Sequence, residues 1–228
     1  MRKYNDPTSP QRGAVCFTFD DYHGENWLKT LPLLKKYDAH VTFFIVGEIT
    51  PEKLSVMKQL RAAGHSVGLH SLLHGDANGP DGVEAYFEKQ VKPQLDICNA
   101  NNFPIRCFAY PNNRHDDVTD PFFFQYFDYL RAGTGKTKPV PVYPVDSLPE
   151  KLVLGGFGIG TYYNSEVSLL KEKLAHAAET DTLLVFFSHD IAPGAEHIHM
   201  PLEWLEELLQ YARSINLRVV GAEDLATI

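Results

Sequence analysis

The sequence is poor in the features that mark several large classes of protein. Its 228 residues include only three cysteines, Cys16, Cys98 and Cys107, and no two of them form a CxxC motif. An odd number of cysteines at wide spacing does not build a disulfide framework, so we expect reduced thiols, with Cys16 and Cys107 buried in strands. No apolar run is long enough to span a bilayer. Residues 1–13 lack the apolar stretch of a signal peptide, which leaves the cytoplasm or export with the signal absent from this sequence.

Positive charge is also scarce. The chain has 21 basic and 29 acidic residues, a net charge of −8, which argues against nucleic acid or an anionic membrane as the main partner. Hydrophobic residues make up 44% of the chain, and neither an internal repeat nor a linker divides it. We therefore predict one domain over residues 14–228, preceded by an N-terminal extension over residues 1–13. The oligomeric state is left open.

Segments typical of strands and helices alternate along the whole chain. Runs rich in β-branched and aromatic residues predict strands at 14–19, 40–46, 65–70, 105–110, 129–133, 151–157, 182–188 and 217–220. Apolar residues at helical spacing predict helices at 25–38, 51–64, 82–99, 120–127, 165–179 and 201–214. Residues 133–150 contain four prolines and are predicted to form a long loop. This alternation implies a parallel sheet in an α/β fold, and seven or eight such units favour a closed barrel.

Polar residues gather where the predicted strands end. The pairs that follow three of the strands are Asp20 and Asp21, His70 and His74, and His189 and Asp190. Barrel enzymes place their chemistry at the carboxyl ends of their strands, so these side chains should converge on one mouth. Two imidazoles and a carboxylate form a three-ligand set for zinc or a similar divalent ion, with a position left for water. The second carboxylate is then free to act as a base.

Each of these patterns also has a purely structural explanation. Adjacent aspartates suit the start of a loop, and two histidines four residues apart often lie on a solvated face. The helical H-E-x-x-H motif of zinc proteases does not apply, because Ser71 stands at the glutamate position and a glycine-containing strand precedes it. We expect a structural role for His65. We expect His197 and His199 to lie in a loop without a second role.

Four motifs in a fixed order resemble a known family. The segments TFDD, GHSVGLHSLLH, FAYP and FFSHD resemble the polysaccharide deacetylases of the NodB-homology type, carbohydrate esterase family 4. The resemblance covers residues 14–220. It implies a distorted (β/α)-barrel of about seven strands that hydrolyses N-acetyl, and sometimes O-acetyl, groups of a glycan with a bound divalent metal.

The resemblance also implies a role for particular residues. Carried over by position, Asp20 would be the catalytic base and His189 the general acid, while Asp21, His70 and His74 would hold the metal. Zinc is expected first, with cobalt, manganese, nickel or iron as alternatives.

The same resemblance places the oxyanion site after the fourth strand. There the segment Tyr110–Pro111–Asn112 would face the substrate, and the backbone N–H of Asn112 would stabilise the oxyanion.

The chain departs from the family pattern at two points. The third motif usually carries an arginine that orients the base aspartate, and Ala109 stands at that position. Arg106 is three residues away and points to the opposite face of its strand. Arg131, at the end of the next strand, is the candidate replacement. We also find no DxxDW motif to orient His189.

Three functional hypotheses follow. The first is a metal-dependent deacetylase whose substrate is an acetylated polysaccharide or oligosaccharide. The second is a non-catalytic glycan-binding relative that retains the metal site. The third is a barrel hydrolase that acts on non-sugar amides.

Overall fold

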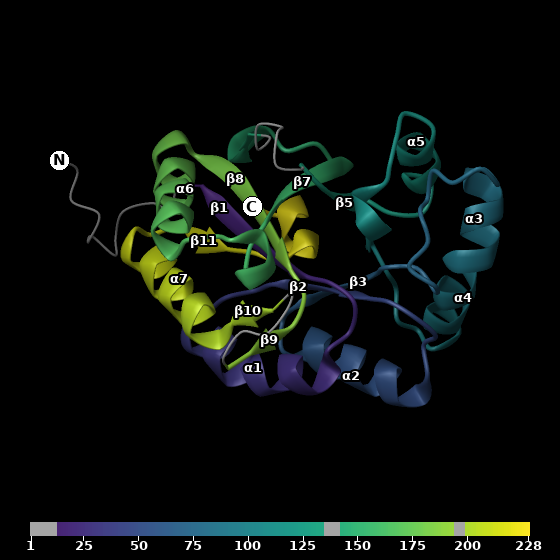
Figure 1. Cartoon of the computed structure of the whole chain (residues 1–228), viewed down its shortest axis with the longest axis horizontal. Helices are drawn as coiled ribbons and strands as arrows, with labels where there is room; N and C mark the ends of the chain where they lie inside the picture. The colour runs from purple at the N-terminus through teal and green to yellow at the C-terminus, as the bar shows by residue number, and fades with distance from the viewer. Residues whose placement is uncertain (1–12, 135–141, 194–198) are drawn as a thin grey trace.

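The computed structural model describes residues 13–134, 142–193 and 199–228. Seven parallel strands close into a barrel at the centre of the molecule (Figure 1). In ring order they are β1 (Ala14–Phe19), β2 (Thr42–Ile45), β3 (Ser66–Leu69), β4 (Cys107–Ala109), β5 (Tyr129–Gly133), β7 (Leu152–Gly158) and β8 (Thr182–Ser188), which pairs back with β1. The predicted α/β barrel of about seven parallel strands is therefore confirmed.

The barrel is distorted where β1 meets its neighbours. On one side β1 pairs with β8 along its whole length, from Ala14 with Leu183 to Phe19 with Ser188. The other edge of β1 is divided between two strands. The start of β1 pairs with β11 (Arg218–Val219), and its end pairs with β2. The short strand β6 (Tyr143–Pro144) runs antiparallel to β8 and lies in the segment that we predicted to be a loop. Outside the barrel, β9 (Ile191–Ala192) pairs with β10 (Met200–Pro201).

Helices surround the barrel (Figure 1). They are α1 (Gly24–Lys36), α2 (Pro51–Ala62), α3 (Val83–Gln90), α4 (Lys92–Ala100), α5 (Thr119–Phe123), α6 (Val167–Thr180) and α7 (Leu202–Ser214), with short 3₁₀ helices η1 (Pro111–Asn113), η2 (Val145–Ser147), η3 (Thr161–Tyr163) and η4 (Ala222–Ala226). In the view of Figure 1, α1 and α2 lie below the strands, α6 and α7 to the left, and α3, α4 and α5 to the right. No helix among the described residues has the length and apolarity needed to cross a membrane.

Two predicted helices differ from those in the structure. The helix predicted at 82–99 is divided at Val91 into α3 and α4. Pro93 explains the break, because proline has no N–H to donate to the preceding turn and its ring crowds the carbonyl four residues earlier. The helix predicted at 120–127 ends at Phe123, and the residues after it form turns.

The core consists of strands that are buried on both faces. Every residue of β1 and of β8 is buried, as expected of parallel strands covered by helices outside and by side chains inside. Cys16 and Cys107 are buried in β1 and β4, as predicted, and Cys98 is buried in α4; burial raises the pKa of the Cys16 thiol to about 12.

His65 is part of this packing. It is 4% exposed, its ring lies edge-on to Phe43, and its Nδ1 accepts a hydrogen bond of 3.3 Å from the backbone N–H of Val41. The pKa of His65 is lowered to about 4, chiefly by burial; nearby His40 contributes to the lowering, and Asp224 opposes it. A protonated ring would lose the bond from Val41, because its Nδ1 would carry hydrogen.

We predict that His65 makes the fold sensitive to mild acid. Between its unfolded pKa of about 6.5 and its folded value of about 4, the unfolded chain binds a proton that the folded chain does not, so stability falls as pH is lowered. In His65→Gln, the drop in the free energy of unfolding from pH 7 to pH 4.5 should be smaller by about 2 kcal/mol, measured by urea denaturation. The exposed His176→Gln is the control. Identical pH dependence in His65→Gln and the wild type would contradict the prediction.

Candidate functional site

Side chains from four strand ends meet at one mouth of the barrel. Asp20 and Asp21 follow β1, His70 follows β3, and His189 follows β8, while Arg131 lies within β5. Backbone hydrogen bonds hold these ends together: the N–H of Asp20 donates to Ser188 at 2.9 Å, and the N–H of His70 donates to Ile45 at 2.9 Å. Because all of these strands are parallel, the mouth is the carboxyl end of the barrel, where barrel enzymes carry their sites.

Asp21, His70 and His74 form a group that could hold a metal ion. One ligand atom from each lies within 4.8 Å of the other two. The Nε2 atoms of His70 and His74 are each 3.6 Å from Oδ1 of Asp21. His70 is buried and the other two are partly exposed, so the group is open to solvent on one side.

The tautomer of His70 suits a metal ligand. Its Nδ1 lies 2.8 Å from the carbonyl oxygen of Ala109. A carbonyl only accepts, so Nδ1 carries the hydrogen and Nε2 keeps its lone pair on the side of Asp21. Burial holds the pKa of His70 below its usual value, which favours the neutral ring. Ala109 lacks the arginine side chain of the family motif, yet its backbone carbonyl orients the His70 ring. Hydrogen bonds of this kind commonly fix the ring orientation of histidines that bind metals.

The backbone at this group is unusual. Asp21, Ser71 and His74 have φ values of 77°, 66° and 54°, in the left-handed region that non-glycine residues rarely adopt. Backbone hydrogen bonds help to fix this segment, because the carbonyl of Ser71 accepts from Gly47 at 2.9 Å. Strained residues of this kind cluster at functional sites when the surrounding structure holds them in place.

Asp20 forms a buried ion pair with Arg131. The two side chains are 3% and 1% exposed, and Nη2 of Arg131 donates to Oδ2 of Asp20. Burial alone would raise the pKa of the Asp20 carboxyl, but the charge and hydrogen bond of Arg131, together with nearby His70 and His189, outweigh burial, and the pKa lies below its usual value. Arg131 is also the register partner of Ala109 on the neighbouring strand. The guanidinium therefore comes from the residue beside the position where the family carries its arginine.

The second oxygen of Asp20 is uncommitted. Its Oδ1 is buried and has no hydrogen-bond partner among the residues that the structure describes. Leaving a charged oxygen unpaired in the interior is costly, so such atoms are rare without a functional reason. Oδ1 is thus available to a water molecule or a substrate.

Among the described residues, no carboxylate lies behind the His189 ring to orient it. Its Nε2 is 3.9 Å from Oδ2 of Asp21, and its buried Nδ1 has no partner within the described part of the chain. This agrees with the missing DxxDW motif. The ring instead lies nearly parallel to that of Tyr163, with centroids 6.5 Å apart, and Nε1 of Trp27 donates to the His189 carbonyl at 3.2 Å. Neither aromatic residue was predicted from the sequence, because no motif marks them.

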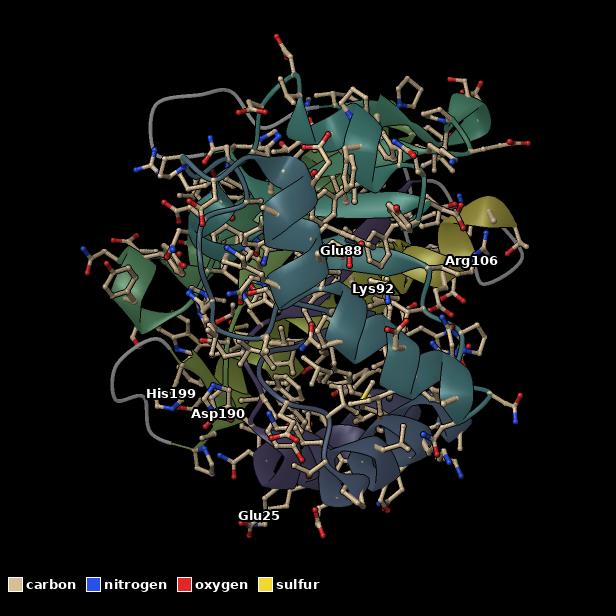
Figure 2. All side chains as sticks on the ribbon, turned by 90° about the vertical axis from the view of Figure 1, so that its right-hand side faces the viewer. Glu25, Glu88, Lys92, Arg106, Asp190 and His199 are labelled. Atoms are coloured by element: carbon tan, nitrogen blue, oxygen red, sulfur yellow. The ribbon has the colours of Figure 1, made fainter. Side chains whose placement is uncertain are left out.

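Asp190 secures the segment that follows His189. Its Oδ2 accepts from Nδ2 of Asn26 at 2.7 Å and lies 3.1 Å from Nε2 of His199 and 3.6 Å from Nδ1 of His23. Figure 2 shows Asp190 and His199 next to each other. His199 lies in a loop, as expected, and its ring contacts a buried carboxylate. His197, the other residue of that HxH pattern, lies outside the described residues.

The segment Tyr110–Pro111–Asn112 leads from β4 into η1. The Tyr110 ring is fully buried, stacked on His115 with centroids 5.3 Å apart, so it contributes to packing behind the mouth. Asn112 is exposed, with φ 52°, and its Nδ2 donates to Asp76 at 2.9 Å. The oxyanion role of its backbone N–H stays a prediction.

Fold and site together define an α/β-barrel protein with a candidate metal centre and a buried carboxylate at the carboxyl ends of its strands. The family model for polysaccharide deacetylases matches residues 8–121, half of the chain. The chain therefore belongs to the polysaccharide deacetylase family, as its motifs indicated.

Individual relatives agree with this assignment. A peptidoglycan-N-acetylglucosamine deacetylase of Bacillus cereus is 39% identical over 67 residues, which are 29% of this chain and 24% of that protein. The chitin deacetylase of Colletotrichum lindemuthianum has a TM-score of 0.65 at 18% identity, covering 94% of this chain and 88% of that one. A carbohydrate esterase family 4 pseudoenzyme from Bacillus anthracis has a TM-score of 0.61 at 17% identity, covering 95% and 66%. The matched segments span less than half of the length of each curated relative.

We predict that Asp20 and Arg131 are strongly coupled in stability. Arg131→Met leaves a buried carboxylate without its partner and should lower the free energy of unfolding by about 3–5 kcal/mol. Adding Asp20→Asn should cost less than the sum of the two single changes. The matched control is Arg106→Met, which breaks the exposed 2.6 Å pair with Asp128 and should cost less than about 1 kcal/mol. Urea denaturation at pH 7 measures all four variants, and additive losses at positions 20 and 131 would speak against the coupling.

Proposed function

We propose that the chain is a metal-dependent hydrolase that removes acetyl groups, N-linked ones first, from a polysaccharide or oligosaccharide. The observation that carries the proposal is the uncommitted Oδ1 of Asp20, buried next to the Asp21–His70–His74 group. A hydrolase of this kind needs a base held ready beside a metal centre. We place the whole activity in one domain, residues 14–228.

Asp21, His70 and His74 would hold one divalent ion. Two imidazole nitrogens and one carboxylate oxygen, with a further position left free, suit zinc, and cobalt, manganese, nickel and iron are the alternatives. The 3.6 Å separations are close to the roughly 3.3 Å between ligand atoms around a tetrahedral zinc ion with bonds of about 2.0 Å. When bound, such an ion polarises the acetyl carbonyl and lowers the pKa of the attacking water.

Asp20 would be the general base. Arg131 occupies Oδ2, so only Oδ1 can take the proton of the attacking water. The guanidinium has two further effects: it keeps the carboxylate ionised, and it fixes the direction in which Oδ1 points. Arg131 would thus do the work of the arginine that is missing at Ala109.

His189 would be the general acid. An amide nitrogen leaves poorly unless it is protonated, and a histidine at the mouth is suited to deliver that proton from Nε2. The parallel Tyr163 ring would limit the movement of the His189 ring in place of a carboxylate, and the bond from Trp27 would hold the His189 backbone. The backbone N–H of Asn112, after Pro111, would donate to the oxyanion.

The substrate class rests on the family and on charge. The net charge of −8 disfavours polyanionic partners, whereas an acetylated glycan fits the family. The Bacillus cereus relative is a peptidoglycan-N-acetylglucosamine deacetylase, which supports an N-acetyl group as the target. The likeness to a pseudoenzyme keeps the non-catalytic glycan-binding function as the second candidate. Turnover of simple amides without turnover of sugars would favour the third, a non-sugar amidase.

We predict that the metal depends on both histidines of the group. His70→Ala and His74→Ala each remove one of three ligands and should weaken zinc binding by more than about 100-fold. Competition with a chromogenic chelator, together with elemental analysis, measures the loss. The exposed His176→Ala is the control and should bind zinc like the wild type. Full zinc occupancy in both site variants would exclude the assigned ligands.

We predict different effects for the base and the acid. Asp20→Asn should keep the metal and lower kcat on an acetylated chito-oligosaccharide by about 10²–10⁴-fold. His189→Ala should also keep the metal, but its loss should be much smaller on an activated aryl acetate, whose leaving group needs little protonation. Equal losses of His189→Ala on both substrates would argue against the acid role. A metal-loaded wild type that binds the oligosaccharide without turnover would favour the non-catalytic alternative.

A further inference from the structure

Arg131 has a second anchor that the proposed mechanism does not use. Its Nη1 donates to Oδ1 of Asn113 at 2.7 Å, while its Nη2 donates to Asp20. We infer that Asn113 is a positioning residue for the reaction: it holds the Arg131 guanidinium in the orientation that aims Asp20. This inference rests on the proposed function, because it assigns Asp20 as the base.

The guanidinium needs such an anchor because of its surroundings. The rings of Phe187 and Phe44 lie near it, with centroids 4.9 and 5.7 Å from its central carbon. Aromatic faces attract the charge but offer no directional acceptor, so they leave the guanidinium free to turn in its own plane. Acceptors at both Nη atoms remove that freedom, as a planar fork of donors allows. Without Asn113, Asp20 would be the only hydrogen-bond acceptor among the described residues to orient the guanidinium, although the guanidinium is the group that has to orient Asp20.

The backbone at Asn113 is shaped to make this contact. Asn112 and Asn113 have φ values of 52° and 56°, two consecutive residues in the left-handed region. Asparagine is among the few residues other than glycine that adopt this region readily. The turn brings the Asn113 amide from η1, after β4, to the arginine on β5.

Gly133 provides the space for the Asn113 amide. It stands two residues after Arg131 on β5, so both residues face the same side of the strand. A Cβ atom at position 133 would lie 2.6 Å from Cγ and Nδ2 of Asn113 and 2.9 Å from its Oδ1. The backbone of Gly133 is not left-handed, so alanine there would meet the amide rather than backbone strain. The missing side chain at 133 is therefore a condition for the bond between Asn113 and Arg131.

The test compares Asn113→Gly, Gly133→Ala and the double variant. Glycine keeps the left-handed backbone and removes only the amide, whereas Gly133→Ala displaces the amide from the other side. Each single change should lower kcat on an acetylated chito-oligosaccharide about 10–100-fold, with KM within about twofold and zinc content unchanged. In the double variant the added methyl group has no amide left to displace, so kcat should match that of Asn113→Gly. Multiplied losses, or an unchanged kcat in Asn113→Gly, would overturn the inference.

The matched control is Asn102→Gly. Asn102 is also left-handed, with φ 53°, but it is exposed and follows α4. This change should leave kcat, KM and zinc content as in the wild type. A loss of kcat in Asn102→Gly equal to that in Asn113→Gly would mean that any glycine in such a turn slows the enzyme, which would also overturn the inference.

A second measurement does not depend on turnover. In the wild type, two fixed acceptors should slow rotation about the guanidinium C–N bonds, so that the Arg131 Nη protons give separate NMR signals, assigned by their loss in Arg131→Lys. In Asn113→Gly and Gly133→Ala these signals should merge. Unchanged signals in both variants would overturn the inference. If the wild type showed no deacetylation, the proposed function would fail, while the signals would still decide whether Asn113 holds Arg131.

Discussion

The buried pair of Asp20 and Arg131 is the interaction on which the candidate site depends. The two residues come from β1 and β5, which are not neighbours: β7 and β8 separate them on one side of the ring, and three strands on the other. The pair therefore crosses the mouth of the barrel. Two desolvated charges are tolerated there only when each is matched by the other and by hydrogen bonds. This requirement fixes the direction of Asp20 and leaves its other oxygen, which is also buried, without a hydrogen-bond partner among the described residues.

The same pair explains why two aspartates stand side by side. Successive residues of an extended strand point to opposite faces, so Asp20 and Asp21 could not both serve one site if β1 simply continued. The left-handed backbone of Asp21 ends the strand and turns its carboxylate towards His70 and His74. The two adjacent carboxylates thus have different partners. Asp20 is neutralised by Arg131, and Asp21 is available to a cation.

Much of this arrangement could be predicted from the sequence, because it depends on local pattern and on one rule of topology. Strands β1, β5 and β8 lie where apolar runs indicated, and the rule that parallel strands end at one mouth brought together Asp20, His70 and His189. Arg131 could be proposed because neighbouring parallel strands present equivalent faces, and Ala109 and Arg131 are indeed in register. The contact of Asn113 with Arg131 could not be predicted, because it depends on two left-handed residues. The contact of His199 with Asp190 could not be predicted either, because it depends on the pairing of the two-residue strands β9 and β10, which leave no pattern in the sequence. Pro93 in the sequence indicated the break between α3 and α4 at Val91, but the regular apolar spacing over residues 82–99 favoured a single helix.

The closure of the barrel also sets an order of assembly. Strand β1 reaches its partner β8 across the length of the chain: Thr18 donates from its hydroxyl to Phe186, 168 residues further on. The three residues that could hold a metal all lie within the first 74 positions, whereas His189 arrives with the strand that closes the ring. During synthesis, Asp21, His70 and His74 therefore emerge from the ribosome long before β8 pairs with β1 and closes the barrel. Until β8 docks, β1 exposes an unpaired edge, and contacts of such long range form slowly. The nascent chain thus carries the candidate metal ligands and an open strand edge together, which makes the interval before closure the stage most exposed to mispairing.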